Sequence, residues 1–98
     1  MRYEMQTYLT PHEVLQAAIS FFGVDLGLDL QSQGPNALYF VGGGGHVTLT
    51  VQTAPDGELT SVEFETREWD IHVEEFMARL ARKRWWRRFW RGVKEELA

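Results

Sequence analysis

The stretch HVTLTVQTAPDGELTSVEFETR, residues 46–67, decides the fold. Two runs with an apolar residue at every second position flank the sequence Ala54-Pro55-Asp56-Gly57, which favours a tight turn. Alternation of this kind is typical of strands that bury one face of a sheet. The stretch therefore predicts two antiparallel strands, over residues 46–53 and 59–67. Their predicted core residues are Val47, Leu49, Val51, Val62 and Phe64, and their opposite face carries Thr48, Thr50, Gln52, Ser61, Glu63 and Glu65.

Two more strands are expected upstream of this stretch. Residues 24–31 alternate between apolar and polar side chains, residues 34–36 have the turn sequence Gly-Pro-Asn, and residues 37–41 are again apolar. Short connections between all four strands favour an antiparallel meander. Residues 2–9 alternate only weakly, so they form either a short edge strand or a lead-in segment.

A helix is expected after Thr10. This residue is suited to the N-cap position, Pro11 to the first helical position, and Glu13 to closing a capping box. Gly23 is placed to end the helix in a left-handed conformation. Apolar residues at helical spacing form the predicted buried stripe, namely Val14, Leu15, Ala18, Ile19, Phe21 and Phe22.

A second helix follows the strands, with Asp70 as its predicted N-cap. Its first half has a stripe made of Val73, Phe76, Met77, Leu80 and Ala81. Its second half is sharply amphipathic, and on the same helical wheel its apolar side points about half a turn away from the first stripe. We expect this switch near Lys83. The apolar side holds Trp85, Trp86, Phe89, Trp90, Val93 and Leu97, and the basic side holds Arg84, Arg87, Arg88, Arg91 and Lys94.

These elements predict an α+β fold, a two-layer sandwich with the order α-β-β-β-β-α. Two helices cover one face of the four-stranded meander, and the other face is left open. Residues 1–82 are expected to form the α+β domain, and residues 83–98 its basic, Trp-rich helical extension. A single straight helix cannot bury both stripes on one surface. The chain is therefore expected either to break near Lys83 or to place its second stripe on another surface.

Composition excludes several classes of function. The 98 residues contain no Cys, so disulfides, thiol catalysis and Cys-based zinc sites are excluded. No apolar run approaches the ~20 residues of a membrane span, and the N-terminus lacks the pattern of a secretory signal. A soluble, cytoplasmic protein is the expectation. Residues 1–78 hold twelve acidic and two basic residues, whereas residues 79–98 hold eight basic and two acidic ones.

Few residues suggest chemistry. The loop Gly42-Gly43-Gly44-Gly45, followed by His46, is a candidate ligand loop, but a strand rather than a helix follows it, as in a hairpin or a bulge. His12, His46 and His72 have no metal-binding spacing, so no metal or other cofactor is expected. Glu63 and Glu65 share a strand face about 7 Å apart, which suits a paired-carboxylate site but more commonly marks a solvated surface. We expect no enzymatic activity.

The Trp-rich segment leaves several interpretations open. It can mediate self-association or bind a protein partner, since Trp and Arg are favoured in interface cores. It can bind the surface of an anionic membrane, at the inner face of the cell membrane, or fold back onto its own domain. Nucleic acid is disfavoured because the acidic residues of the domain repel phosphate. A small-ligand site between sheet and helices is a further alternative. The leading hypothesis is a homo-oligomeric or partner-binding module.

Overall fold

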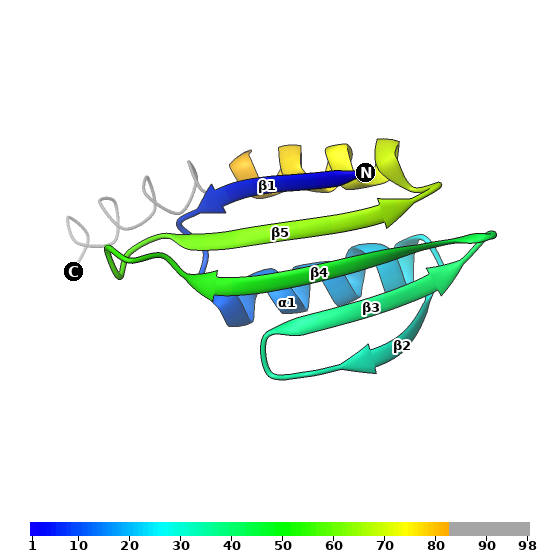
Figure 1. The fold of residues 1–98 in the computed structure, drawn as a ribbon, viewed down its shortest axis with the longest axis horizontal. Helices are drawn as coiled ribbons and strands as arrows, with labels where there is room; N and C mark the ends of the chain where they lie inside the picture. The colour runs from blue at the N-terminus through cyan, green and yellow to red at the C-terminus, as the bar shows by residue number, and fades with distance from the viewer. Residues whose placement is uncertain (83–98) are drawn as a thin grey trace, which may run out of the picture.

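A five-stranded antiparallel sheet forms the centre of the computed structural model, which describes residues 1–82 (Figure 1). The order of its strands is β1-β5-β4-β3-β2. The α+β class is confirmed, but the predicted count of four strands is wrong. The strands are β1 (Arg2–Thr7), β2 (Asp29–Gln33), β3 (Ala37–Gly42), β4 (Gly45–Thr53) and β5 (Thr60–Arg67).

Strand β1 is the additional strand, and it lies at the edge of the sheet beside β5. Its register runs from Arg2 opposite Glu65 to Thr7 opposite Thr60. The N-terminal amine donates a hydrogen bond of 2.7 Å to the carbonyl of Thr66, which anchors the start of the strand. Only Thr7 is fully buried in β1, because an edge strand has a neighbouring strand on one side only. This partial burial explains the weak alternation of the sequence.

The first helix begins as predicted and ends later than predicted. In α1 (Pro11–Ala18), Thr10 Oγ1 accepts a hydrogen bond from Glu13 N, and Glu13 Oε1 accepts one from Thr10 N, so the capping box is confirmed. The chain then continues as a π-helix, η1 (Ile19–Asp25). Gly23 lies inside this helix, so its predicted role as C-cap is wrong. The left-handed residue is Gly27, with φ of +75°.

The predicted strand over residues 24–31 is confirmed only for residues 29–31, which begin β2, and is wrong for residues 24–28. Its first two residues belong to η1, and Val24 is 76% exposed. Of the four alternating apolar residues only Leu28 is buried, and it lies in the loop before β2. All five residues of β2 are exposed, because this strand forms the second edge of the sheet. Its register against β3 shifts between Leu30 and Ser32, as expected for an edge strand protected by a bulge.

The second helix covers residues 70–82 of the part that the structure describes. Val73 N donates to Trp69 O, so Asp70 is the first helical residue rather than the predicted N-cap. Its carboxylate instead accepts a 2.9 Å hydrogen bond from the hydroxyl of Tyr3. The buried stripe is confirmed for Val73, Phe76 and Leu80, whereas Ala81 is exposed and its assignment was wrong. The predicted switch of stripe near Lys83 lies outside the described residues.

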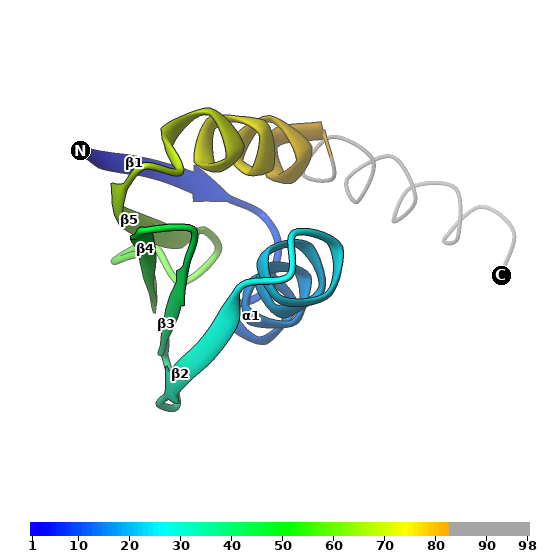
Figure 2. The same ribbon diagram turned by 90° about the vertical axis from the view of Figure 1, so that its right-hand side faces the viewer.

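Both helices lie on one face of the sheet, as Figure 2 shows. A cluster of Phe rings fills the space between the layers. The ring of Phe76 lies 5.4 Å from that of Phe21, 5.1 Å from that of Phe22 and 5.9 Å from that of Phe64. Among residues 1–82, no helix has the length and apolar character needed to cross a bilayer.

Candidate functional site

The loop of four glycines is the turn of a hairpin between β3 and β4. Gly43 and Gly44 have φ of +57° and +79°, the combination required by a two-residue type I′ turn. A Cβ atom on Gly45 would overlap the backbone carbonyl of Arg67. The hairpin interpretation is therefore confirmed, while the proposed role of this loop and His46 in ligand binding stays a prediction.

Trp69 packs against this hairpin, a contact that the sequence did not reveal. Its indole Nε1 donates a 2.9 Å hydrogen bond to the carbonyl of Gly42. A Cβ atom on Gly43 would come within 2.8 Å of the indole ring, so a larger residue would push the ring away. The Trp69 ring also lies 5.1 Å from the ring of His72. These contacts hold the hairpin against the start of the second helix.

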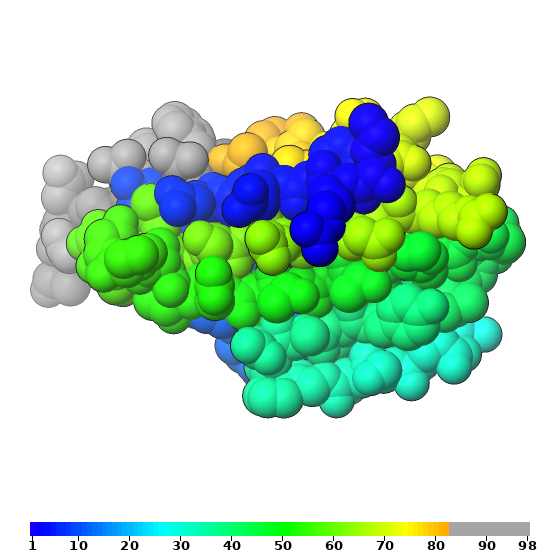
Figure 3. All heavy atoms as spheres, in the orientation of Figure 1, coloured from blue at the N-terminus to red at the C-terminus, as the bar shows by residue number. Residues whose placement is uncertain are grey.

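Figure 3 shows the face of the sheet opposite the helices, which we call the open face. Most of its side chains are polar or charged. Side chains in register cross it from strand to strand, with none of them buried. Four carboxylates and two guanidinium groups give it a net negative charge. The charged residues are Asp29, Glu4, Glu63, Glu65, Arg2 and Arg67, and the other central residues are Ala37, Tyr39, Val41, His46, Thr48 and Thr50.

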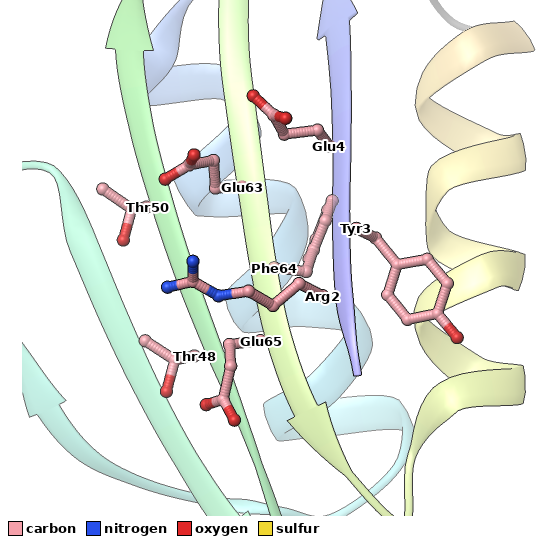
Figure 4. A pocket seen from close by; sticks show the side chains of 8 residues that line it. All are labelled: Arg2, Tyr3, Glu4, Thr48, Thr50, Glu63, Phe64 and Glu65. Atoms are coloured by element: carbon pink, nitrogen blue, oxygen red, sulfur yellow. The ribbon is translucent and has the colours of Figure 1, made fainter.

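A shallow hollow of about 180 Å³ lies on the open face, over β1, β5 and β4. Its lining includes Glu63 and Glu65 of β5 and the short side chains Thr48 and Thr50 of β4. Figure 4 shows the side chain of Arg2 crossing β5, with its guanidinium between the two glutamates. The hollow therefore accommodates a guanidinium group near carboxylates, although among the described residues no ion pair joins Arg2 to Glu63 or Glu65.

His46 is the second polar feature of the open face. Its Nε2 lies 2.8 Å from Oε2 of Glu65, and its ring lies 5.9 Å from the ring of Tyr39. This contact makes Glu65 part of a network, whereas Glu63 stays exposed. A carboxylate pair in glycoside hydrolysis works on a substrate bound between its members. Here Arg2 occupies that position, so the arrangement resembles a charged surface more than a reaction centre.

The three histidines do not come together. His12 lies on α1, His46 on β4 and His72 on the second helix, and within residues 1–82 no group of three His, Asp or Glu residues is arranged to hold a metal ion. The predicted interface residues, Arg84 to Leu97, lie outside the described residues.

The structure adds the open face, which the sequence had indicated only as the polar side of two strands. No protein-family model matches the chain, and the search of curated proteins gave no match either.

Proposed function

We propose that the protein is a small non-enzymatic interaction module that binds a second copy of itself through residues 83–98. The observation that carries this proposal is how the helix over residues 70–82 uses its apolar stripe. Val73, Phe76 and Leu80 are at most 2% exposed, and Phe76 contacts rings from both the sheet and the first helix. That side of the helix is therefore already committed to the core of its own domain.

The Trp-rich stripe needs a different surface. On a continuous helical wheel at about 100° per residue, the mean direction of Trp85, Trp86 and Trp90 lies roughly 130° from that of Val73, Phe76 and Leu80. Each large aromatic side chain that leaves water contributes about 1.5–3 kcal/mol. Exposing three of them would instead favour unspecific association. A specific site on a second copy would bury them without this cost.

Charge favours a second copy over an anionic membrane. Residues 1–82 hold twelve acidic and four basic residues, whereas residues 83–98 hold six basic and two acidic ones. The domain of one copy therefore attracts the C-terminal segment of another. An anionic lipid surface attracts the same segment but repels the domain, and screening limits both effects to about 8 Å at physiological salt.

Sedimentation equilibrium of the full chain tests this proposal. We expect a dimer for the full chain and a monomer for a full-length variant carrying Trp86→Ala and Trp90→Ala. A chain ending at Arg82 should also be monomeric, with a circular dichroism spectrum that shows a folded sheet. A monomeric full chain would refute the proposal. If that monomer sediments with vesicles of anionic lipid at low salt, membrane binding is the function to pursue instead.

A further inference from the structure

We infer that the open face of the sheet is the surface that receives residues 83–98 of a second copy. This inference rests on the proposed self-association and adds to it the place where the segment binds. The open face is the side of the sheet that neither described helix covers. It is also the surface where the structure groups acidic side chains around a hollow.

The open face has two halves with different chemistry. On β1 and β5, the carboxylates Glu4, Glu63 and Glu65 outnumber the guanidinium groups of Arg2 and Arg67 by one, and we call this the acidic half. On β3, Ala37, Tyr39 and Val41 carry no formal charge, and Tyr39 is 38% exposed; Asp29 of β2 is the charged residue on this half. Between them β4 contributes Thr48 and Thr50, whose short side chains make the centre of the face low.

An amphipathic helix matches this division. Strands β3 and β5 are two strand spacings apart, about 9.5 Å, so a helix about 10–12 Å wide that lies over β4 touches both halves. The aromatic side of residues 83–98 can then contact β3 and β4. The basic residues at one border of that side reach the carboxylates of β5. Arg87 and Arg88 lie toward opposite borders of the aromatic side, so either orientation of the helix brings bases to the acidic half.

Arg2 indicates which group the hollow accepts. Its guanidinium lies between Glu63 and Glu65 (Figure 4), which is the position that an Arg of the second copy would take. In this arrangement Arg2 competes with the incoming arginine. Removing its charge should therefore tighten the association, whereas a purely structural role for Arg2 predicts no change or a weaker dimer.

The position of the second helix favours a second copy over the same chain. Residues 70–82 lie on the side of the sheet opposite the open face, so residues 83–98 would have to pass around an edge of the sheet to reach the open face of their own chain. A neighbouring molecule presents its open face without this obstacle. If each copy binds residues 83–98 of the other on its open face, the result is a closed dimer with two-fold symmetry.

Charge reversal on the two surfaces tests the inference with the full chain. We expect Glu63→Lys with Glu65→Lys to weaken the dimer at least tenfold in sedimentation equilibrium, and Arg87→Glu with Arg88→Glu to do the same. The chain that carries all four substitutions should recover most of the lost affinity, because opposite charges face each other again. Arg2→Gln should tighten the dimer several-fold.

Two further variants serve as controls. Glu58→Lys with Glu74→Lys makes the same change of charge at exposed positions away from the open face, and it should leave the affinity nearly unchanged. Glu63→Gln with Glu65→Gln removes the charges without adding new ones. Thermal unfolding of each variant shows whether it is folded. A dimer that loses affinity through Arg87→Glu and Arg88→Glu, but keeps it with both glutamates reversed, would refute the open face and leave self-association standing. A monomeric wild type would overturn both.

Discussion

Substituting the two central glycines of the β3–β4 hairpin separates the cost of backbone conformation from the cost of displacing Trp69. Gly43 and Gly44 both have positive φ, at +57° and +79°. An alanine at either position therefore costs about 1–2 kcal/mol for the left-handed conformation. Only at Gly43 would the new Cβ atom meet the indole ring, at 2.8 Å; at Gly44 no atom lies within 4 Å. The two variants are thus a matched pair.

We expect Gly44→Ala to lower the free energy of unfolding by about 1–2 kcal/mol. Gly43→Ala should lower the free energy of unfolding by a further amount of about 1–3 kcal/mol, the usual cost of forcing an extra methyl group into a packed contact. In a domain of this size each kcal/mol lowers Tm by about 4–8 °C. Urea unfolding monitored by circular dichroism gives both free energies from the same signal.

A second background, Trp69→Ala, tests the cause of the difference. When Trp69 is replaced by alanine, Gly43→Ala and Gly44→Ala should cost the same, because the ring that distinguishes them is gone. Equal costs for Gly43→Ala and Gly44→Ala in the wild-type background would refute the packing of Trp69 against the hairpin. A difference that persists in Trp69→Ala would refute it as well.

Three smaller predictions concern single contacts. Thr10→Ala should destabilise the domain by about 1 kcal/mol in thermal unfolding, while Thr10→Ser, which keeps the cap, should stay close to wild type. Partial burial of Tyr3 and its hydrogen bond to Asp70 raise its pKa above the ordinary 10.0, so the stability it contributes is present at neutral pH and lost as the pH rises through the folded value. An ultraviolet titration should show this high pKa fall in Asp70→Asn, and an unchanged titration would contradict the contact. Backbone N–H groups of Glu58 and Leu59 lower the pKa of Asp56 below 3.8, so its contribution is present above that pH and lost as the pH falls through the folded value; a carboxyl NMR titration with an ordinary midpoint would contradict it.

The central strands could be predicted because each buries one full face. Val47, Leu49 and Val51 alternate with Thr48 and Thr50, and the burial of the structure follows this alternation residue by residue. The capping box at Thr10 is equally local, since it depends on residues three apart. In both cases the pattern and the structure report the same contacts.

The errors lie where burial is partial or the helix departs from regular geometry. Val24, Leu26, Leu28 and Leu30 alternate as a strand would, but a π-helix carries the chain through Asp25, and the apolar spacing continues into a loop. Strand β1 gave a weak pattern because only its Thr7 is fully buried. No local sequence feature predicts a π-helix or an edge strand with a single buried residue.

The candidate site was visible only in part. The sequence placed Glu63 and Glu65 on one strand face, but Arg2 comes from a strand that is more than 60 residues away in the chain and joins them only through the register of β1 against β5. Trp69 and the glycine hairpin meet for the same reason, across a separation of 27 residues. Sequence patterns describe each element well and say little about which elements become neighbours.

A spin label on the open face gives the most direct test of where residues 83–98 bind. The chain contains no Cys, so Thr50→Cys provides a single attachment site in the centre of the open face, and Glu74→Cys provides a control on the second helix. Spin-labelled chains without ¹⁵N are mixed with ¹⁵N-labelled wild-type chains. Only contacts between copies can then broaden the observed signals. We predict that the label at residue 50 broadens the indole N–H signals of Trp85, Trp86 and Trp90, and that the label at residue 74 leaves them sharp. Sharp signals with the label at residue 50, in a sample that is dimeric, would contradict the account.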